Sequence, residues 1–302
     1  TRRSSDLLNE IEKMLYVVKA DFSSPDRPLS MTLMLGPTGV GKTETVRLIA
    51  EAIYGRPDAF CRIDMNTLAQ EHYAAALTGA PPGYVGSKEG HSLFDETAIA
   101  GSHTRPGIML FDELEKASTE VIRGLMNVLD TGRLTLTAGT KTIDFRNCMI
   151  FMTSNVGAQA AQQYLEKLSY LPQQVQNLCL KKVPTQRIIE KVMQRKFDPE
   201  FLNRIDRTLH YQAVQNDALP RLVEIELDKL NQRLQHQKRQ IHLTDAAKAH
   251  FYQGHDIRYG ARHLGRKIRT ELEPILAIYF LNHPEQLQLH LDCINGQLLV
   301  QP

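Results

Sequence analysis

The stretch that decides the fold reads Gly36-Pro37-Thr38-Gly39-Val40-Gly41-Lys42-Thr43. It fits the pattern G-x-x-x-x-G-K-[ST], the phosphate-binding loop called Walker A. Its glycines allow a tight turn that aims backbone N–H groups at phosphate oxygens, and the following helix adds the positive end of its dipole. We therefore predict that every residue of this stretch binds a nucleotide. Lys42 is predicted to contact the β- and γ-phosphates, and the Thr43 hydroxyl to hold Mg²⁺.

The segments on either side of this loop have the patterns that a nucleotide-binding loop requires. An apolar run at residues 31–35 precedes it and is typical of a buried parallel strand. Residues 44–54 follow it with apolar side chains at helical spacing. A glycine-rich turn without a ligand is the alternative interpretation, and the order strand, loop, helix disfavours it. The loop predicts nucleotide binding but does not say what the nucleotide drives.

The composition limits the class of protein. A chain of 302 residues is long enough for one or two domains with a sizeable core. Its 36 basic and 34 acidic residues give a net charge of +2, which gives no reason to expect nucleic acid as the main partner. The 4 cysteines have no paired spacing, so we expect reduced thiols in a reducing compartment and no zinc site.

The hydropathy pattern indicates a protein without a membrane partner. No apolar run approaches the roughly 18 residues that span a bilayer. The chain begins at Thr1 with no signal-peptide pattern, and we expect a cytoplasmic location. The missing initiator methionine indicates a fragment or a processed chain.

A second candidate nucleotide motif ends in two carboxylates. The apolar run at residues 107–111 predicts a buried strand, and Asp112 and Glu113 follow at its C-terminal end, where open parallel sheets place their ligands. Asp112 is predicted to hold Mg²⁺ through its water shell, and Glu113 to orient the attacking water or accept its proton. A solvated acidic turn is the alternative. Asn155 ends the next apolar strand, where an amide can orient the same water, although such an Asn is more often a turn former.

The remaining patterns predict a large α/β domain over residues 1–211 and a small, mostly helical domain over residues 212–302. In the large domain we expect two further strands, at 60–64 and 209–211, a hairpin at 133–145, and helices at 5–19, 91–100, 118–129 and 199–203, with two more between 157 and 197. In the small domain we expect helices at 217–237, 244–253 and 260–281, then a hairpin of residues 287–293 and 297–301 with an Asn-Gly turn.

The motifs in combination resemble those of the AAA+ ATPases, and more narrowly the C-terminal ATPase module of the Clp ring unfoldases of the ClpB type. The strings that carry the resemblance are GPTGVGKTE, PPGYVGSKEG, FDELEKA, GRLT, DFRN, MTSNVG, PEFLNRID and YGAR. The resemblance covers about residues 26–300. The resemblance implies an α/β P-loop domain with a parallel sheet, a helical lid domain after it, and Mg²⁺-dependent hydrolysis of ATP.

The resemblance also implies roles for residues that spacing alone does not single out. Asn155 is similar to sensor 1 of the family. Arg204 is similar to the arginine finger, which acts on the nucleotide of a neighbouring subunit, and Arg262 to sensor 2, which reaches the γ-phosphate of its own subunit. A guanidinium suits both roles because it can neutralise charge on the transferring phosphoryl group, whereas either arginine taken alone predicts a surface ion pair. A homo-oligomeric ring, a hexamer, is implied.

The string Gly83-Tyr84-Val85-Gly86 resembles the aromatic pore loop of this family. Its glycines permit a mobile loop, and the flat amphipathic ring of Tyr84 can grip a polypeptide without sequence preference. Outside this context a β-turn with a packed tyrosine would be favoured. The resemblance thus implies a protein unfoldase or disaggregase that threads polypeptide substrates through a central pore.

Two other functions stay open, a nucleic-acid-directed motor of the same superfamily and a non-threading assembly module. The near-neutral charge disfavours the first, and the filled catalytic positions disfavour a module that has lost hydrolysis. Two departures from the family pattern matter. Residues 1–20 lack the Val-Ile-Gly-Gln stretch near the adenine pocket, so specificity for ATP rests on the resemblance. Residues 156–200 contain no Ile-Gly-Phe or Ile-Gly-Leu loop, so no ClpP-type peptidase is expected as a partner.

Overall fold

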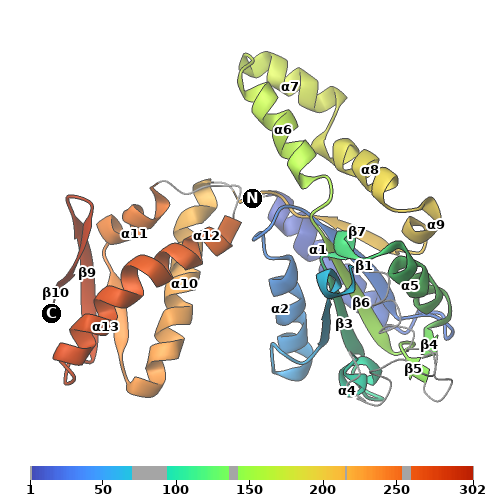
Figure 1. Cartoon of the computed structure of the whole chain (residues 1–302), viewed down its shortest axis with the longest axis horizontal. Helices are drawn as coiled ribbons and strands as arrows, with labels where there is room; N and C mark the ends of the chain where they lie inside the picture. Colours follow the sequence, from blue (N-terminus) through green and yellow to red (C-terminus); the bar gives the residue numbers. More distant parts are fainter. Residues whose placement is uncertain (1, 70–93, 136–141, 215, 254–259, 302) are drawn as a thin grey trace. The chain divides into compact units, whose positions relative to one another are not determined.

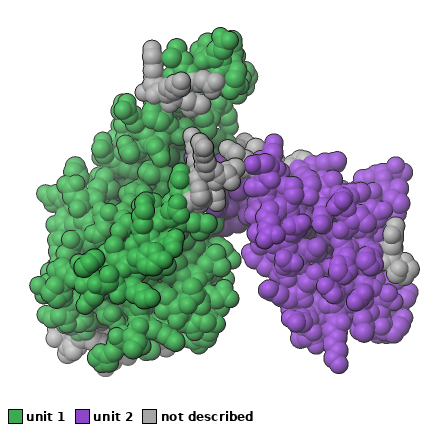
Figure 2. Space-filling view, turned by 180° about the vertical axis from the view of Figure 1, so that it is seen from behind, with its two compact units in different colours: residues 1–36, 41–211 green, residues 37–40, 212–302 purple. Residues whose placement is uncertain are grey.

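The computed structural model describes residues 2–69, 94–135, 142–214, 216–253 and 260–301 (Figure 1). The chain forms two compact units, which Figure 2 colours separately. Unit 1 comprises residues 1–36 and 41–211, and unit 2 comprises residues 37–40 and 212–302. The predicted pore loop, residues 83–86, lies outside the described residues.

Unit 1 is built on a five-stranded parallel sheet with the strand order β2-β3-β6-β1-β7. The strands are β1 (Ser30–Leu35), β2 (Cys61–Asp64), β3 (Gly107–Asp112), β6 (Cys148–Ser154) and β7 (Arg207–His210). The three central strands are buried at every residue, as their continuous apolar runs predict for a parallel sheet packed on both faces. The predicted α/β fold with a parallel sheet is therefore confirmed.

The crossovers of this sheet explain its layers. From β1 the chain crosses to β2 in one direction along the sheet, and from β3 it crosses to β6 in the other. Right-handed crossovers in opposite directions put their helices on opposite faces, and Figure 1 shows α2 (Lys42–Tyr54) and α5 (Thr119–Thr131) on the two sides. Leu33, Phe111 and Ile150 belong to the same buried core cluster as Val121 and Leu125 of α5.

The other helices of unit 1 lie before, between and after these strands. They are α1 (Arg2–Lys19), α4 (Glu96–Ala100), α6 (Ala158–Ser169), α7 (Gln173–Lys182), α8 (Thr185–Lys196) and α9 (Pro199–Leu202). A two-stranded antiparallel ribbon pairs β4 (Arg133–Thr135) with β5 (Thr142–Asp144), where the hairpin was expected.

Two helix predictions in unit 1 were wrong in detail. The stretch from 157 to 197 forms three helices and not two, because Pro172 and Pro184 stand directly before α7 and α8 and cannot continue a preceding helix. The helix expected from residue 91 begins at Glu96, because the Asp95 side chain caps it by accepting the Ala98 N–H at 3.1 Å.

Unit 2 packs helices against a small sheet with the strand order β10-β9-β8. Its helices are α10 (Leu219–Leu234), α11 (Asp245–Tyr252), α12 (Gly260–Lys267) and α13 (Glu273–Asn282), and its strands are β8 (Gln240–Leu243), β9 (Gln288–Ile294) and β10 (Gln297–Gln301). The C-terminal hairpin is confirmed, with positive φ angles at Asn295 and Gly296, which a tight hairpin turn of this type needs.

Two features of unit 2 differ from the sequence prediction. Strand β8 was missed, and it pairs in parallel with β9. The helix expected at 260–281 contains a π-helical turn at Ile268–Leu272. Pro274 follows that turn and has no N–H to donate back to it, which explains why the regular bonding pattern changes there. None of the helices in the described part of the chain has the length and apolar character to cross a bilayer.

Candidate nucleotide site

The P-loop begins directly after β1 and needs glycine at its first position. Gly36 has a φ of 155°, and a Cβ there would lie 2.5 Å from the Tyr211 carbonyl oxygen, too close for any side chain. Helix α2 then starts at Lys42 with Gly41 as its N-cap, which has no side chain to cap the first turn. The N–H groups at this helix start and the helix dipole make a binding place for phosphate.

Tyr211 supports the P-loop from behind. Its N–H donates to the Leu35 carbonyl at 2.7 Å, and its hydroxyl lies 2.8 Å from the Thr45 hydroxyl on α2. Burial raises the pKa of this phenol, so it stays a neutral hydrogen-bonding group. Tyr211 therefore links the end of β1 to the helix that follows the loop.

Lys42 joins the P-loop to the end of β6. Its Nζ donates to the Gly36 carbonyl at 2.6 Å and to the Asn155 side-chain oxygen at 2.7 Å, and the residue is only 7% exposed. The parallel register that pairs Leu35 with Ser154 brings Asn155 to this position. The ammonium group can exchange these neutral oxygens for phosphate oxygens, which are stronger acceptors.

Asp112 lies at the end of β3, beside Thr43. Its Oδ2 is 3.5 Å from the Thr43 hydroxyl oxygen, and the residue is 5% exposed. A hydroxyl and a carboxylate are the hard oxygen donors that Mg²⁺ prefers, and the ion takes its other ligands from phosphates and water. The pair therefore fits Mg²⁺, as the sequence predicts for Thr43 and Asp112.

Thr153 fixes both acids of this motif. Its hydroxyl donates to Asp112 Oδ1 and accepts the Glu113 N–H at 3.0 Å, and the residue is 1% exposed. Sequence reasoning missed Thr153 as a site residue. The available signal was a hydroxyl near the C-terminal end of a fully buried, mainly apolar strand, since such a group needs a partner.

Glu113 adopts a left-handed backbone conformation with φ 59° and ψ 50°. Such a conformation is uncommon for a residue that is not Gly, Asn or Asp, and it costs on the order of 1 kcal/mol. The turn is held by the bond from the Glu113 N–H to Thr153 and by the short 3₁₀ helix Leu114–Lys116 that follows. Backbone strain of this kind clusters at functional sites, in keeping with the role predicted for Glu113.

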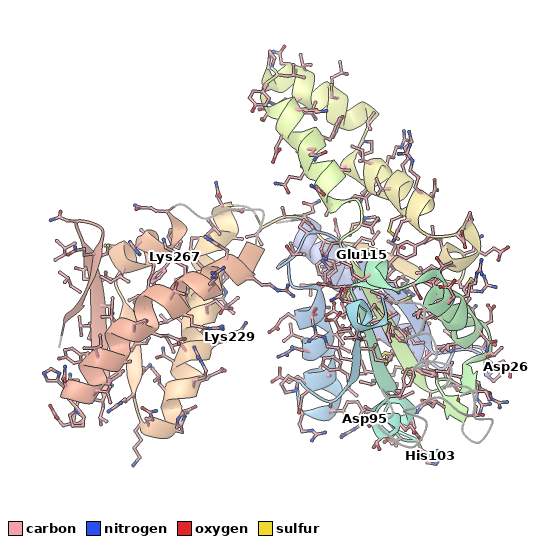
Figure 3. All side chains as sticks on the ribbon, viewed as in Figure 1. Asp26, Asp95, His103, Glu115, Lys229 and Lys267 are labelled. Carbon is pink, nitrogen blue, oxygen red and sulfur yellow. The ribbon has the colours of Figure 1, made fainter. Side chains whose placement is uncertain are left out.

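Glu115 positions the end of β6. Its Oε1 accepts the Asn155 N–H at 3.1 Å, and its Oε2 is buried without a hydrogen-bond partner among the described residues (labelled in Figure 3). The chain of contacts therefore runs from Lys42 through Asn155 to Glu115. Sequence reasoning did not select Glu115, because no spacing rule separates it from the solvated acids of a turn.

Arg204 does not join this group. Its Nε lies 2.7 Å from both oxygens of Asp130 on α5, and its Nη1 donates to the Glu200 carbonyl on α9 at 2.5 Å. Arg204 and Asp130 are both partly exposed. The guanidinium is thus held on the surface of unit 1 by neighbours that belong neither to the P-loop nor to β3.

Arg262 lies in unit 2, at an exposed position on α12. Within the same unit, the Ala261 N–H beside it donates to the Gly39 carbonyl at 2.9 Å. Gly260 has a φ of 54°, and a Cβ there would lie 2.7 Å from that same carbonyl oxygen. The start of α12 therefore approaches the middle of the P-loop backbone, and only a glycine allows the approach.

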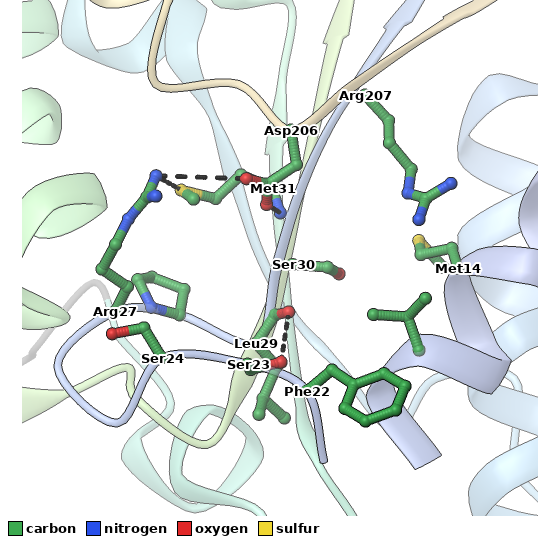
Figure 4. A pocket seen from close by; sticks show the side chains of 12 residues that line it. Met14, Phe22, Ser23, Ser24, Arg27, Leu29, Ser30, Met31, Asp206 and Arg207 are labelled. Carbon is green, nitrogen blue, oxygen red and sulfur yellow. Dashed lines mark hydrogen bonds and ion pairs between the residues drawn. The ribbon is translucent and has the colours of Figure 1, made fainter. Parts of the chain in front are cut away.

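A cavity of about 320 Å³ lies at the other end of β1 (Figure 4). Apolar side chains and arginines line it, and three contacts shape its wall. Ser23 Oγ donates to the Leu29 carbonyl at 3.0 Å, the Met31 N–H donates to Asp206 Oδ2 at 2.7 Å, and Arg27 Nη2 donates to the Arg204 carbonyl at 3.2 Å. Because the P-loop follows the opposite end of the same strand, this cavity is separate from the nucleotide site.

Comparisons with known families cover most of the chain. Residues 27–208 match the family described as AAA domain (Cdc48 subfamily). Residues 214–288 match the family described as the C-terminal, D2-small domain of ClpB protein.

Three similar proteins come from bacteria, and the names of two refer to ATP-dependent proteases. The chain is 47% identical over 281 residues to the "ATP-dependent protease ATP-binding subunit-like protein AmiB" of Pseudomonas aeruginosa, which covers 91% of this chain and 75% of that protein. It is 40% identical over 300 residues to the "ATP-dependent protease ATP-binding subunit-like protein" of Rhodococcus erythropolis, covering 97% and 85%. It is 37% identical over 295 residues to the "Negative regulator of genetic competence ClpC/MecB" of Bacillus subtilis, and spans 35% of that protein.

Proposed function

Because the chain belongs to the AAA domain family (Cdc48 subfamily), and is a Clp-type ATPase with the small domain of a ClpB second ATPase module, we propose that it works as a ring-forming protein unfoldase. In this proposal a homo-oligomer, a hexamer, uses ATP hydrolysis to drive polypeptide through its central pore. The observation that carries the proposal is a pair of side-chain contacts at the C-terminal edge of the parallel sheet. Lys42 contacts Asn155, and Thr43 contacts Asp112.

Each residue of the site has a separate role in the hydrolysis of ATP. Lys42 binds the phosphates by exchanging the Gly36 and Asn155 oxygens for phosphate oxygens. That exchange frees the Asn155 amide to orient the attacking water, and Glu113 accepts the proton of that water. Mg²⁺, when bound by Thr43 and Asp112, supplies positive charge to the β- and γ-phosphates.

The two arginines connect hydrolysis to assembly in this proposal. Arg204 acts on the nucleotide of the next subunit. A partly exposed ion pair contributes little to stability, so its guanidinium can turn from Asp130 to a neighbour's phosphate at low cost. Arg262 serves the γ-phosphate of its own subunit, and α12 is joined to the loop that holds the phosphates through Ala261 and Gly39.

The proposed substrate is a polypeptide gripped by Tyr84. The names of the relatives from P. aeruginosa and R. erythropolis describe proteins like the ATP-binding subunits of proteases. We propose that this chain nevertheless acts without a ClpP-type peptidase, because residues 156–200 contain neither Ile-Gly-Phe nor Ile-Gly-Leu. Nucleic acid is not part of the proposed activity, in keeping with the net charge of +2.

Turnover of ATP per subunit, measured against protein concentration with Mg²⁺ present, tests the shared site. Turnover that rises steeply with concentration, and that Arg204→Ala abolishes, is expected if a neighbour completes the site. Arg195→Ala is a matched control, because Arg195 is an exposed arginine on α8. A flat rate that Arg204→Ala leaves unchanged would contradict the ring.

Unfolding of a tagged fluorescent protein tests the threading. Tyr84→Ala is expected to stop unfolding while ATP turnover persists, whereas Tyr170→Ala, at a tyrosine that is 89% exposed, should change neither. Unfolding at the wild-type rate by the Tyr84 variant would show that the loop does not grip substrate. Degradation of the substrate on addition of a ClpP-type peptidase would overturn the proposed independence, and stimulation of turnover by DNA would favour the nucleic-acid motor.

A further inference from the structure

Arg62 contacts the carboxylate that the proposed metal site uses, although no motif assigns it a role. It lies on β2, which pairs in parallel with β3 so that Asp64 is opposite Asp112. The Arg62 Nε donates to Asp112 Oδ2 at 3.1 Å, and its Nη2 donates to the same oxygen at 2.6 Å. Both bonds therefore end on one oxygen of the acid.

The acceptor capacity of Asp112 Oδ2 is fully used in this arrangement. A carboxylate oxygen has about two lone-pair directions. Oδ1 accepts the Thr153 hydroxyl, and Oδ2 accepts both Arg62 N–H groups. The Thr43 hydroxyl oxygen is 3.5 Å from the same Oδ2, at the limit of hydrogen bonding. A metal ion or metal-bound water that binds Oδ2 next to Thr43 must therefore displace at least one Arg62 bond.

The exposure of the two side chains decides which of them can move. The Asp112 side chain is 8% exposed, whereas the Arg62 side chain is 45% exposed. A buried carboxylate is costly without a compensating positive charge, but a half-exposed guanidinium can turn into water at little cost. The arginine is therefore the side chain that can move away when another cation approaches Oδ2.

We propose that Arg62 is a positioning residue that competes with Mg²⁺ for Asp112 Oδ2 and so sets how tightly the site holds the metal. Arrival of Mg²⁺ releases Arg62 to solvent, and return of Arg62 assists departure of the metal after hydrolysis. This inference rests on the proposed function, since it requires that Thr43 and Asp112 hold Mg²⁺. It adds to that function a residue of β2 that controls the exchange of the metal.

Binding of a fluorescent ADP analogue at increasing Mg²⁺ tests the competition without any turnover. The half-saturating Mg²⁺ concentration of protein carrying the analogue is expected to fall about tenfold in Arg62→Gln, the size expected for a hydrogen bond to a charged group. The half-saturating Mg²⁺ concentration of Arg62→Lys should lie between those of the wild type and Arg62→Gln, because an ammonium keeps the charge but loses the second hydrogen bond. Arg47→Gln is the matched control, since it removes the same charge from an exposed position on α2 and should leave the value unchanged.

A second measurement follows melting temperature without nucleotide. Arg62→Gln leaves the Asp112 charge uncompensated, so Mg²⁺ alone should raise its melting temperature more than that of the wild type. If Arg62→Gln only disturbed the fold, it would not tighten metal binding. This measurement therefore separates competition for Asp112 from a structural defect. Affinity for the analogue in EDTA shows that each variant is folded.

The outcomes separate this inference from the proposal on which it rests. Asp112→Asn should remove the effect of Mg²⁺ on analogue affinity, and if it responds like the wild type the metal site itself is wrong. If Asp112→Asn behaves as expected but Arg62→Gln needs the same or more Mg²⁺ than the wild type, the competition is refuted while the metal site stands.

Discussion

Replacing Thr153 by valine tests whether one hydroxyl holds both acids of the site in place. The two side chains have nearly the same shape, and β6 favours β-branched residues, so the change removes little but the hydroxyl. It breaks the bond to Asp112 and leaves the Glu113 N–H without its acceptor.

The magnitude follows from these two bonds. A hydrogen bond to a charged group contributes about 2 kcal/mol, and a buried donor left without a partner costs about 2 kcal/mol more. Unit 1 has the size at which about 1 kcal/mol lowers the melting temperature by about 3 °C, so we expect a fall of about 10 °C. We also expect the kcat for ATP to fall about a hundredfold, because Glu113 loses the bond that fixes its turn.

The assay is ATP turnover under saturating nucleotide together with thermal unfolding of the same preparations. Thr153→Ser is the control, because it keeps the hydroxyl and loses only a buried methyl group, worth about 1 kcal/mol. It should keep turnover within about threefold of the wild type. The reasoning is refuted if Thr153→Val keeps wild-type turnover, or if the serine variant loses as much as the valine variant.

Three further changes have expected outcomes. Gly36→Ala should abolish binding of a fluorescent nucleotide, because its Cβ would meet the Tyr211 carbonyl at 2.5 Å; binding within threefold of wild type would contradict the close approach. Glu115→Ala should lower kcat about tenfold with little change in KM, since the Asn155 N–H loses its acceptor. Glu115→Gln should keep kcat near the wild-type value. Equal losses of kcat in both variants would show that the carboxylate charge matters instead. Burial lowers the pKa of His210 below its ordinary value, so its proton is bound more readily after unfolding. The stability that follows is present above about pH 6.5 and is lost as pH falls. Between pH 7.5 and 5.5 the melting temperature of His210→Gln should therefore drop less steeply than that of the wild type. Equal slopes would exclude His210 as the cause.

The sequence predicted the parts of the fold that local pattern determines. Apolar runs before the P-loop and before Asp112 indicated buried parallel strands, and both are central strands of the sheet. The chain order of those runs also indicated which acids and amides end at the same edge. These predictions succeed because strand burial and loop chemistry are encoded within a few neighbouring residues.

What the sequence did not predict depends on contacts between distant segments. Arg62 and Thr153 reach Asp112 only through the pairing of β2, β3 and β6, and no local spacing reports strand order. Strand β8 was missed because four residues between two helices carry too little periodicity to identify a strand. The roles of Tyr84 and Arg204 remain predictions, since each concerns a substrate or a neighbouring subunit.

The left-handed turn at Glu113 affects how substitution experiments at this residue can be read. A valine or isoleucine there would lose activity through the backbone alone, because β-branched residues strongly disfavour this conformation. A deep mutational scan would therefore score the position as intolerant even if its carboxylate did nothing. Asparagine fits the backbone but shortens the side chain, and glutamine keeps the length but removes the charge. The chemistry of Glu113 is thus measured by the contrast between the glutamine variant and the wild type, and not by the average over all substitutions.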